Sequence, residues 1–139
     1  MTKIVDTGIA VVGTDENKAH LTFGADIAFS ENDVGAGRSG FVKFTLDLAI
    51  YDEDLAFDDL VGRYSHVFEP SVFAETVGVD MPVDVDSRHM AFLELGIESN
   101  VELFGIFTLR KDGHRVGHPK HTRKINLSVT RDGFWYFPI

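Results

Sequence analysis

The chain contains no cysteine among its 139 residues. Disulfide bonds, thiolate metal sites and a thiol nucleophile are therefore excluded. Basic residues are also scarce, because 13 Lys and Arg stand against 22 Asp and Glu and leave a formal net charge of -9. Binding to nucleic acid phosphates needs a basic face, so we expect no nucleic acid partner.

Long apolar runs are absent as well. No stretch approaches the roughly 20 consecutive apolar residues that cross a bilayer as a helix, and the first residues lack the pattern of a secretory signal. We therefore expect a soluble, cytoplasmic protein. The sequence also lacks the nucleophile elbow, the H-E-x-x-H zinc motif, the P-loop and the dinucleotide-binding glycine motif, so we expect no catalytic activity.

The sequence has enough apolar material for a core. Hydrophobic residues make up 44% of the chain and include 12 Phe, which excludes a disordered chain. A chain of this length can bury roughly two-thirds of its unfolded surface in one core. We expect one domain over residues 1–139.

Apolar and polar residues alternate along three segments, 19–29, 41–51 and 123–131. Such alternation buries one face of a β-strand and leaves the other in water. The segment 101–109 is apolar on both faces, which indicates a central or covered strand. Further strands are expected at 4–12, 62–68, 90–98 and 134–138.

Turn residues fill the connections, including 30–40 (SENDVGAGRSG) and the Asp-Gly pairs at 112–113 and 132–133. Glycine accepts the positive φ that tight turns require. Only 70–78 has helical character. The pattern predicts an antiparallel β-sandwich of seven to eight strands, jelly-roll-like or similar, with one short helix near 70–78; a β-barrel is the alternative.

An acidic segment, YDEDLAFDDLVG (51–62), follows one of these strands. Ca²⁺ takes six to eight oxygen ligands, and carboxylates from one loop can supply several of them. Asp is also a common turn residue, so a solvated turn is the alternative. The candidate calcium ligands are Asp52, Asp54, Asp58 and Asp59.

The stretch AIYDEDLAFDDLVG (49–62) resembles the third calcium loop of C2 domains, in which a strand runs into D-x-D, a spacer and D-x-x-G. Asp52, Asp54, Asp59 and Gly62 occupy the matching positions. The resemblance implies a β-sandwich whose loops hold Ca²⁺, which bridges to anionic phospholipid. A second acidic run, with Asp80, Asp84 and Asp86, would support calcium if it lay beside this loop.

A basic, histidine-rich segment covers 110–124 (RKDGHRVGHPKHTRK), with six Lys or Arg and one Asp. An excess of cations favours contact with an anion, such as a phosphate or an acidic sugar, or with the acidic face of a second copy. Three histidines could instead hold a transition metal, and a solvated hairpin loop is the third possibility. The candidate residues for anion or partner contact are Arg110, Lys111, His114, Arg115, His118, Lys120, His121, Arg123 and Lys124.

These patterns favour a non-catalytic binding module with a C2-like acidic loop that binds Ca²⁺ and through it a membrane or a protein partner. The first alternative is a structural β-sandwich that assembles into a homo-oligomer through the basic segment and the aromatic residues 134–137. The second is a small metal-dependent enzyme that uses His114, His118 and His121.

Overall fold

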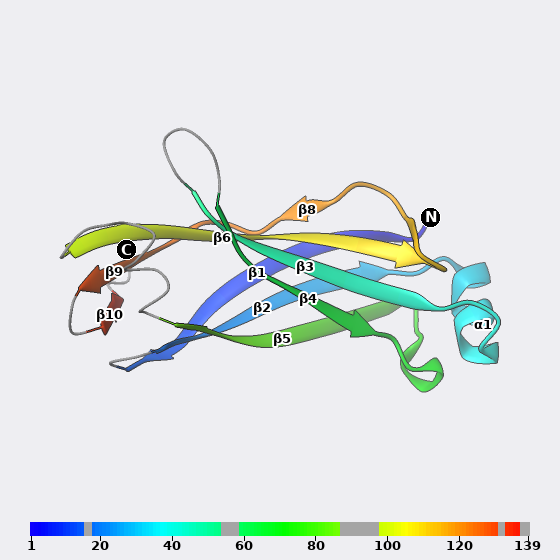
Figure 1. Cartoon of the computed structure of the whole chain (residues 1–139). Coiled ribbons are helices and arrows are strands. Elements are labelled where there is room, and N and C mark those ends of the chain that lie inside the picture. The colour runs from blue at the N-terminus through cyan, green and yellow to red at the C-terminus, as the bar shows by residue number, and fades with distance from the viewer. Residues whose placement is uncertain (16–17, 54–58, 87–97, 131–132, 137–139) are drawn as a thin grey trace.

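The structure is a computed structural model that describes residues 1–15, 18–53, 59–86, 98–130 and 133–136. Its strands form two antiparallel sheets, one of three strands in the order β1-β2-β5 and one of seven strands. The main path of the larger sheet is β10-β9-β6-β3-β4, and β7 and β8 also pair with β6. Figure 1 shows the two sheets as two layers, with α1 at one end and β9 and β10 at the other.

The smaller sheet consists of β1 (Lys3–Thr14), β2 (Lys18–Ala28) and β5 (Thr76–Asp86). The larger sheet consists of β3 (Phe44–Asp52), β4 (Asp59–Val67), β6 (Glu98–Lys111), β7 (His114–Arg115), β8 (Lys120–His121), β9 (Ile125–Thr130) and β10 (Gly133–Tyr136). The two helices are α1 (Glu31–Ser39) and the single 3-10 turn η1 (Pro70–Val72).

The alternating residues of both sheets meet in one apolar core. Phe23 and Ile27 of β2 are fully buried, as are Leu46 and Ile50 of β3 and Phe107 of β6. Burial of one face of each strand is the main stabilising contribution in such a fold. The β-sandwich predicted from the alternation is confirmed, and β6 is the central strand that its two apolar faces indicate.

Gly105 of β6 allows the two sheets to approach closely. A Cβ atom at this position would lie 2.8 Å from Leu48 Cδ1 and 2.9 Å from Phe23 Cδ1, both closer than real contacts of this kind. The side chain of Phe23, which comes from the opposite sheet, therefore fills the space that a larger residue at 105 would need.

Two elements differ from the sequence-based expectation. Residues 31–39, expected as a connection, form α1, because the Ser30 side chain accepts a hydrogen bond from the Asp33 N–H and Gly40 ends the helix at a φ of 79°. Such a cap and a left-handed glycine are typical helix boundaries. The helix expected over 70–78 is limited to the turn η1, and β5 begins at Thr76.

The basic segment 110–124 folds back along β6. Asp112 and Gly113 form the predicted tight turn, with φ values of 48° and 84°. Thr122 is buried, and its hydroxyl accepts a hydrogen bond from the Gly105 N–H at 2.9 Å. Arg123 donates to the Ile9 carbonyl at 3.0 Å and so joins this segment to β1 of the other sheet. The segment is therefore part of the sandwich edge.

The part of the chain that the structure describes contains no helix that is long and apolar enough to cross a membrane. The strand expected at 90–98 lies outside the described residues, apart from residue 98 at the start of β6.

Candidate functional site

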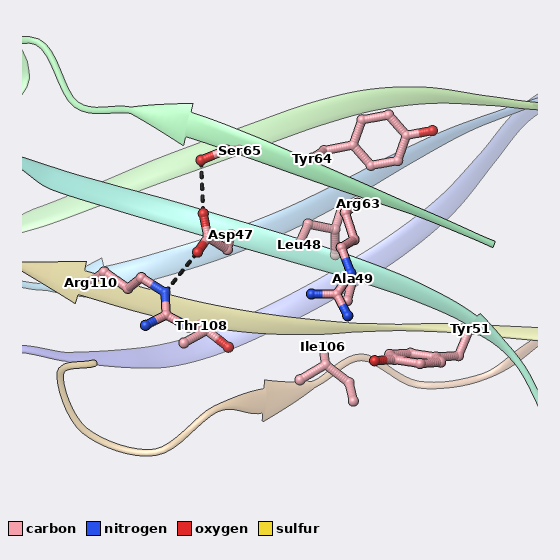
Figure 2. A pocket seen from close by; sticks show the side chains of 10 residues that line it. All are labelled: Asp47, Leu48, Ala49, Tyr51, Arg63, Tyr64, Ser65, Ile106, Thr108 and Arg110. Carbon is pink, nitrogen blue, oxygen red and sulfur yellow. Dashed lines mark hydrogen bonds and ion pairs between the residues drawn. The ribbon is translucent and has the colours of Figure 1, made fainter. Parts of the chain in front are cut away.

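A groove of about 410 Å³ lies on the outer face of the larger sheet, across β4, β3 and β6 (Figure 2). Its volume is within the range of small-molecule sites, about 300 to 1,000 Å³. We call it the outer groove and define it by side chains from these three strands: Asp47, Ala49, Tyr51, Arg63, Ser65, Ile106, Thr108 and Arg110.

The register of the strands creates the groove. Ser65, Asp47 and Thr108 occupy one row across the sheet, and Arg63, Ala49 and Ile106 occupy the next. Alternate residues of a strand point to the same face, and the intervening β3 residues, including Leu46 and Leu48, are buried in the core. The small side chain of Ala49 leaves the centre of the face hollow.

A fixed polar network lies at one end of the outer groove. The Ser65 hydroxyl donates to one carboxylate oxygen of Asp47 at 2.8 Å, and Arg110 Nε donates to the other at 2.8 Å. The guanidinium of Arg110 also donates to the Gly113 carbonyl at 3.3 Å. Both oxygens of Asp47 therefore accept hydrogen bonds within the protein, and Arg110 is held from two sides.

Arg63 is the second cation of the outer groove. It is exposed and extends from β4 over Ala49 toward β6 (Figure 2). Among the described residues it forms no ion pair, whereas Arg110 is paired with Asp47. Two cations and one carboxylate thus give the groove one net positive charge on a chain whose net charge is -9.

Aromatic rings lie at the other end of the outer groove. The ring of Tyr51 stacks on Phe104 with centroids 5.7 Å apart, and Phe104 stacks on His121 at 5.8 Å. Phe104 is buried between its two neighbours. Stacked rings of this kind stabilise one another, so Tyr51 forms a fixed wall beside the apolar surface of Ala49 and Ile106.

Two of the predicted calcium ligands, Asp52 and Asp59, lie where β3 ends and where β4 begins. Asp52 is the last residue of β3, on its inward face, and is only 1% exposed. Asp59 begins β4 at the Cα position directly across from Asp52. Asp54 and Asp58 lie outside the described residues. Gly62, which matches the C2 pattern, lies within β4.

A carboxylate pair adjoins this hairpin. Lys124 Nζ lies 2.6 Å from a Glu53 carboxylate oxygen, and its hydrogen bond lowers the pKa of Glu53 below the ordinary value. The hydrogen bond with Glu53 raises the pKa of Glu102. Lys124, from the basic segment, therefore offsets part of the negative charge at this end of β3.

The structure uses several of the predicted anion contacts within the chain. Arg110 pairs with Asp47, Lys111 with Asp33 at 2.8 Å, and Lys124 with Glu53. Of the remaining residues, Arg123 binds a backbone carbonyl, and His121 stacks on Phe104. The side chains of His114, Arg115, His118 and Lys120 are exposed. Arg110 alone of the nine also lines the outer groove.

Within the described ranges, no three His, Asp or Glu side chains are grouped so that they could hold a metal ion. His114, His118 and His121 thus do not form the site that a metal-dependent enzyme would need. The second acidic run lies on β5, which pairs with β2 in the smaller sheet. There, the Asp84 carboxylate lies 2.6 Å from His20 Nδ1, and Asp15 lies 3.2 Å from Nε2; both hydrogen bonds raise the pKa of His20.

Two other hollows have different linings. One, of about 580 Å³, lies beside α1 and includes Phe29 and Arg38, whose Nε donates to the Phe73 carbonyl. The other lies on the outer face of the smaller sheet between Asp6, Asp26 and Asp80, and is acidic. The outer groove combines Arg63, which has no ion-pair partner among the described residues, with a fixed polar network and the stacked ring of Tyr51. It is therefore the strongest candidate site.

Sequence reasoning did not identify Asp47, Arg63, Ser65 or Tyr51 as site residues. One signal was available, because Asp47 is the single charged residue of β3 before its last residue, Asp52. The row that it forms with residues of two other strands depends on the register, which the sequence pattern does not provide.

No family model matches the chain, and no curated protein matches it. Two crystal structures of a glycosyl hydrolase family 2 member from Bacteroides cellulosilyticus are similar to it, each with a TM-score of 0.57, 13% identity and 93% of this chain covered. The chain spans only 15% and 16% of those two chains. A protein from Archaeoglobus fulgidus has a TM-score of 0.48 at 6% identity, with 99% of both chains covered. The similarity to the first two supports the fold, that of a β-sandwich domain.

Proposed function

We propose that this chain is a non-catalytic binding module and that the outer groove holds its ligand. The observation that carries the proposal is the joint placement of exposed Arg63, the Asp47–Arg110 pair and the Tyr51 ring around one hollow of ligand size. Concave sites with a few convergent polar groups on an apolar surface are typical of small-molecule recognition.

The hydrogen bonds of the groove favour binding over catalysis. Asp47 is the carboxylate of the groove, and both of its oxygens accept hydrogen bonds from Ser65 and Arg110. A general base must reach the proton of a bound substrate. Asp47 instead orients Arg110, whose guanidinium is then pre-positioned for a ligand at little further cost in side-chain entropy.

Filling the groove tests this proposal. The variant Ala49→Trp places an indole over the centre of the groove, on a face that points away from the core. In a screen of small molecules, compounds that bind the wild type raise its thermal midpoint. At one hundred times Kd, binding adds about 2.7 kcal/mol to the free energy of unfolding. We expect these shifts to disappear in Ala49→Trp.

The matched control is Thr22→Trp, which adds the same ring to the smaller sheet at a position that pairs with Pro82. It should keep every ligand-induced shift of the wild type. Equal shifts in the wild type and in Ala49→Trp would place the ligand elsewhere and contradict the proposal.

The second candidate function is calcium binding at the end of the β3–β4 hairpin, through Asp52, Asp54, Asp58 and Asp59. The observation that favours it is the direct opposition of two acidic residues, Asp52 and Asp59, across the strand pair. Like charges in such positions destabilise a sheet, and a cation relieves their repulsion. Bound Ca²⁺ would then bridge to an anionic membrane or protein surface.

Thermal midpoints in excess EDTA, in Ca²⁺ and in Mg²⁺ test this candidate. The candidate predicts a rise with Ca²⁺ that the double variant Asp54→Asn, Asp58→Asn lacks. This pair leaves the buried Asp52 in place, because its substitution would disturb the core directly. An unchanged midpoint on addition of Ca²⁺ would make the acidic segment a turn without a metal.

A further inference from the structure

We propose that the ligand of the outer groove is a small ring compound that carries a carboxylate, with the carboxylate on Arg63 and the ring over Ile106, beside the Tyr51 ring. The inference rests on the proposed function and adds the chemical class of the ligand. It covers two sources of the same chemistry, an acidic sugar and an aromatic carboxylate.

The first support is the balance of hydrogen-bonding groups. Asp47, the carboxylate of the groove, already accepts from Ser65 and Arg110. Arg63 contributes five N–H donors, and among the described residues it has no ion-pair partner. The groove thus offers mainly donors, and a ligand rich in acceptors complements it.

The second support is charge. Arg63 and Arg110 exceed Asp47 by one positive charge, so one carboxylate neutralises the groove. A guanidinium matches a carboxylate with two parallel N–H···O bonds, which are stronger than bonds between neutral groups. A phosphate dianion would bring a second negative charge, with Arg110 already paired to Asp47.

The third support is the apolar part of the groove. The guanidinium of Arg63 lies above Ala49, and Ile106 and the Tyr51 ring continue the surface on the β6 side (Figure 2). A ring bonded to the carboxylate would cover the apolar surface of Ile106 and exclude water from it. Such burial stabilises a complex roughly in proportion to the apolar area removed from water.

Calorimetric titration with two matched pairs of probes tests the inference. Glucuronate is compared with glucose, and benzoate with benzyl alcohol, against the wild type, Arg63→Gln and Lys18→Gln. Lys18 is the control, because it is an exposed cation on β2 of the smaller sheet and does not line the groove. Arg63 is exposed too, so neither substitution removes core packing.

We expect at least one acid to bind the wild type and Lys18→Gln equally, and to bind more tightly than its neutral partner. Loss of one charge-assisted pair should weaken binding to Arg63→Gln by about tenfold or more. Arg63→Lys should give an intermediate affinity, because it keeps the charge and loses the two parallel bonds. The acid that binds identifies the source, sugar or aromatic.

Three results would overturn the inference. They are equal affinity of an acid and its neutral partner, equal affinity of Arg63→Gln and Lys18→Gln for the acid, and absence of binding by both acids. The thermal screen separates this inference from the proposed function. Neutral compounds that stabilise the wild type but not Ala49→Trp would leave the proposed function standing while the carboxylate assignment fails. Equal shifts in the wild type and in Ala49→Trp would instead reject the outer groove as the ligand site.

Discussion

A single carboxylate, that of Asp33, joins three separate parts of the chain. It is 14% exposed, and it binds the Thr2 hydroxyl and the Lys111 ammonium, the latter at 2.8 Å. The Ser30 hydroxyl, which caps α1, accepts from the Asp33 N–H at 3.2 Å. The start of the chain, the first turn of α1 and the end of β6 therefore depend on one side chain.

The pKa of Asp33 reflects these contacts. Desolvation raises it, but the hydrogen bonds from Lys111, Thr2 and Ser30 together outweigh desolvation, so the pKa lies below its ordinary value. A depressed pKa in the folded state stabilises the protein above the unfolded pKa. That contribution disappears as the pH falls through the folded pKa.

Asp33→Asn should therefore lower the free energy of unfolding at neutral pH, by about 1–2 kcal/mol, because Lys111 loses a charged partner. The difference from the wild type should shrink as the pH falls below about 4. Denaturant unfolding at several pH values measures it. The control is Asp26→Asn, an exposed position on β2, and a loss of equal size and pH dependence there would contradict the role of Asp33.

At the scale of elements, α1 packs against the turn after η1 through a glycine. A Cβ atom on Gly37 would lie 2.7 Å from the ring of Phe73, whereas a Cβ on Gly35 would meet nothing within 4 Å. Both glycines lie inside the same helix, so they form a matched pair that separates packing from helix propensity.

Gly37→Ala should destabilise the protein by about 1–3 kcal/mol, because the added methyl overpacks the contact with Phe73. Gly35→Ala should stabilise it by about 0.4–1 kcal/mol, because alanine loses less backbone entropy in a helix. Chemical denaturation of both variants measures the difference. Equal effects of the two substitutions would contradict the packing described for α1.

The misassignments of α1 and of β5 have separate causes. The signals for α1 were local: Ser30 before it, Glu31 and Asp33 in its first turn, and Gly40 after it. The glycines inside α1 favoured a turn over a helix in the sequence-based prediction, because glycine is typical of turns. The strand β5 alternates Val79, Met81, Val83 and Val85 with exposed residues, but its aspartates suggested an acidic loop.

At the scale of the whole molecule, alternation was sufficient to predict the sandwich, because burial of one strand face depends on period alone. The outer groove was beyond such a prediction. Asp47, Arg63 and Ile106 come from three strands, and their rows follow from the pairing register, with a shift between Ile50 and Tyr51. A shift of one strand by one residue would turn the groove side chains of that strand to the other face.

Ion pairs within the chain explain why the basic segment 110–124 is less available to an outside anion or partner than its sequence indicates. Its positive charges are partly neutralised by Asp47, Asp33 and Glu53 of the same chain. Self-association through the segment, with an acidic face of a second copy as the partner, stays a prediction. It would depend on the exposed cations of the segment that form no ion pair among the described residues, Arg115, Lys120 and Arg123.

The central claim is that the outer groove is the ligand site, and amide chemical-shift mapping of the wild type tests it most directly. Titration with a ligand found in the thermal screen should shift the amides around Ala49, Arg63 and Ile106 in a saturable manner. Amides on the outer face of the smaller sheet, such as those of Thr22 and Asp80, should stay unchanged. Shifts that gather on the smaller sheet or beside α1, with the groove unperturbed, would contradict the account.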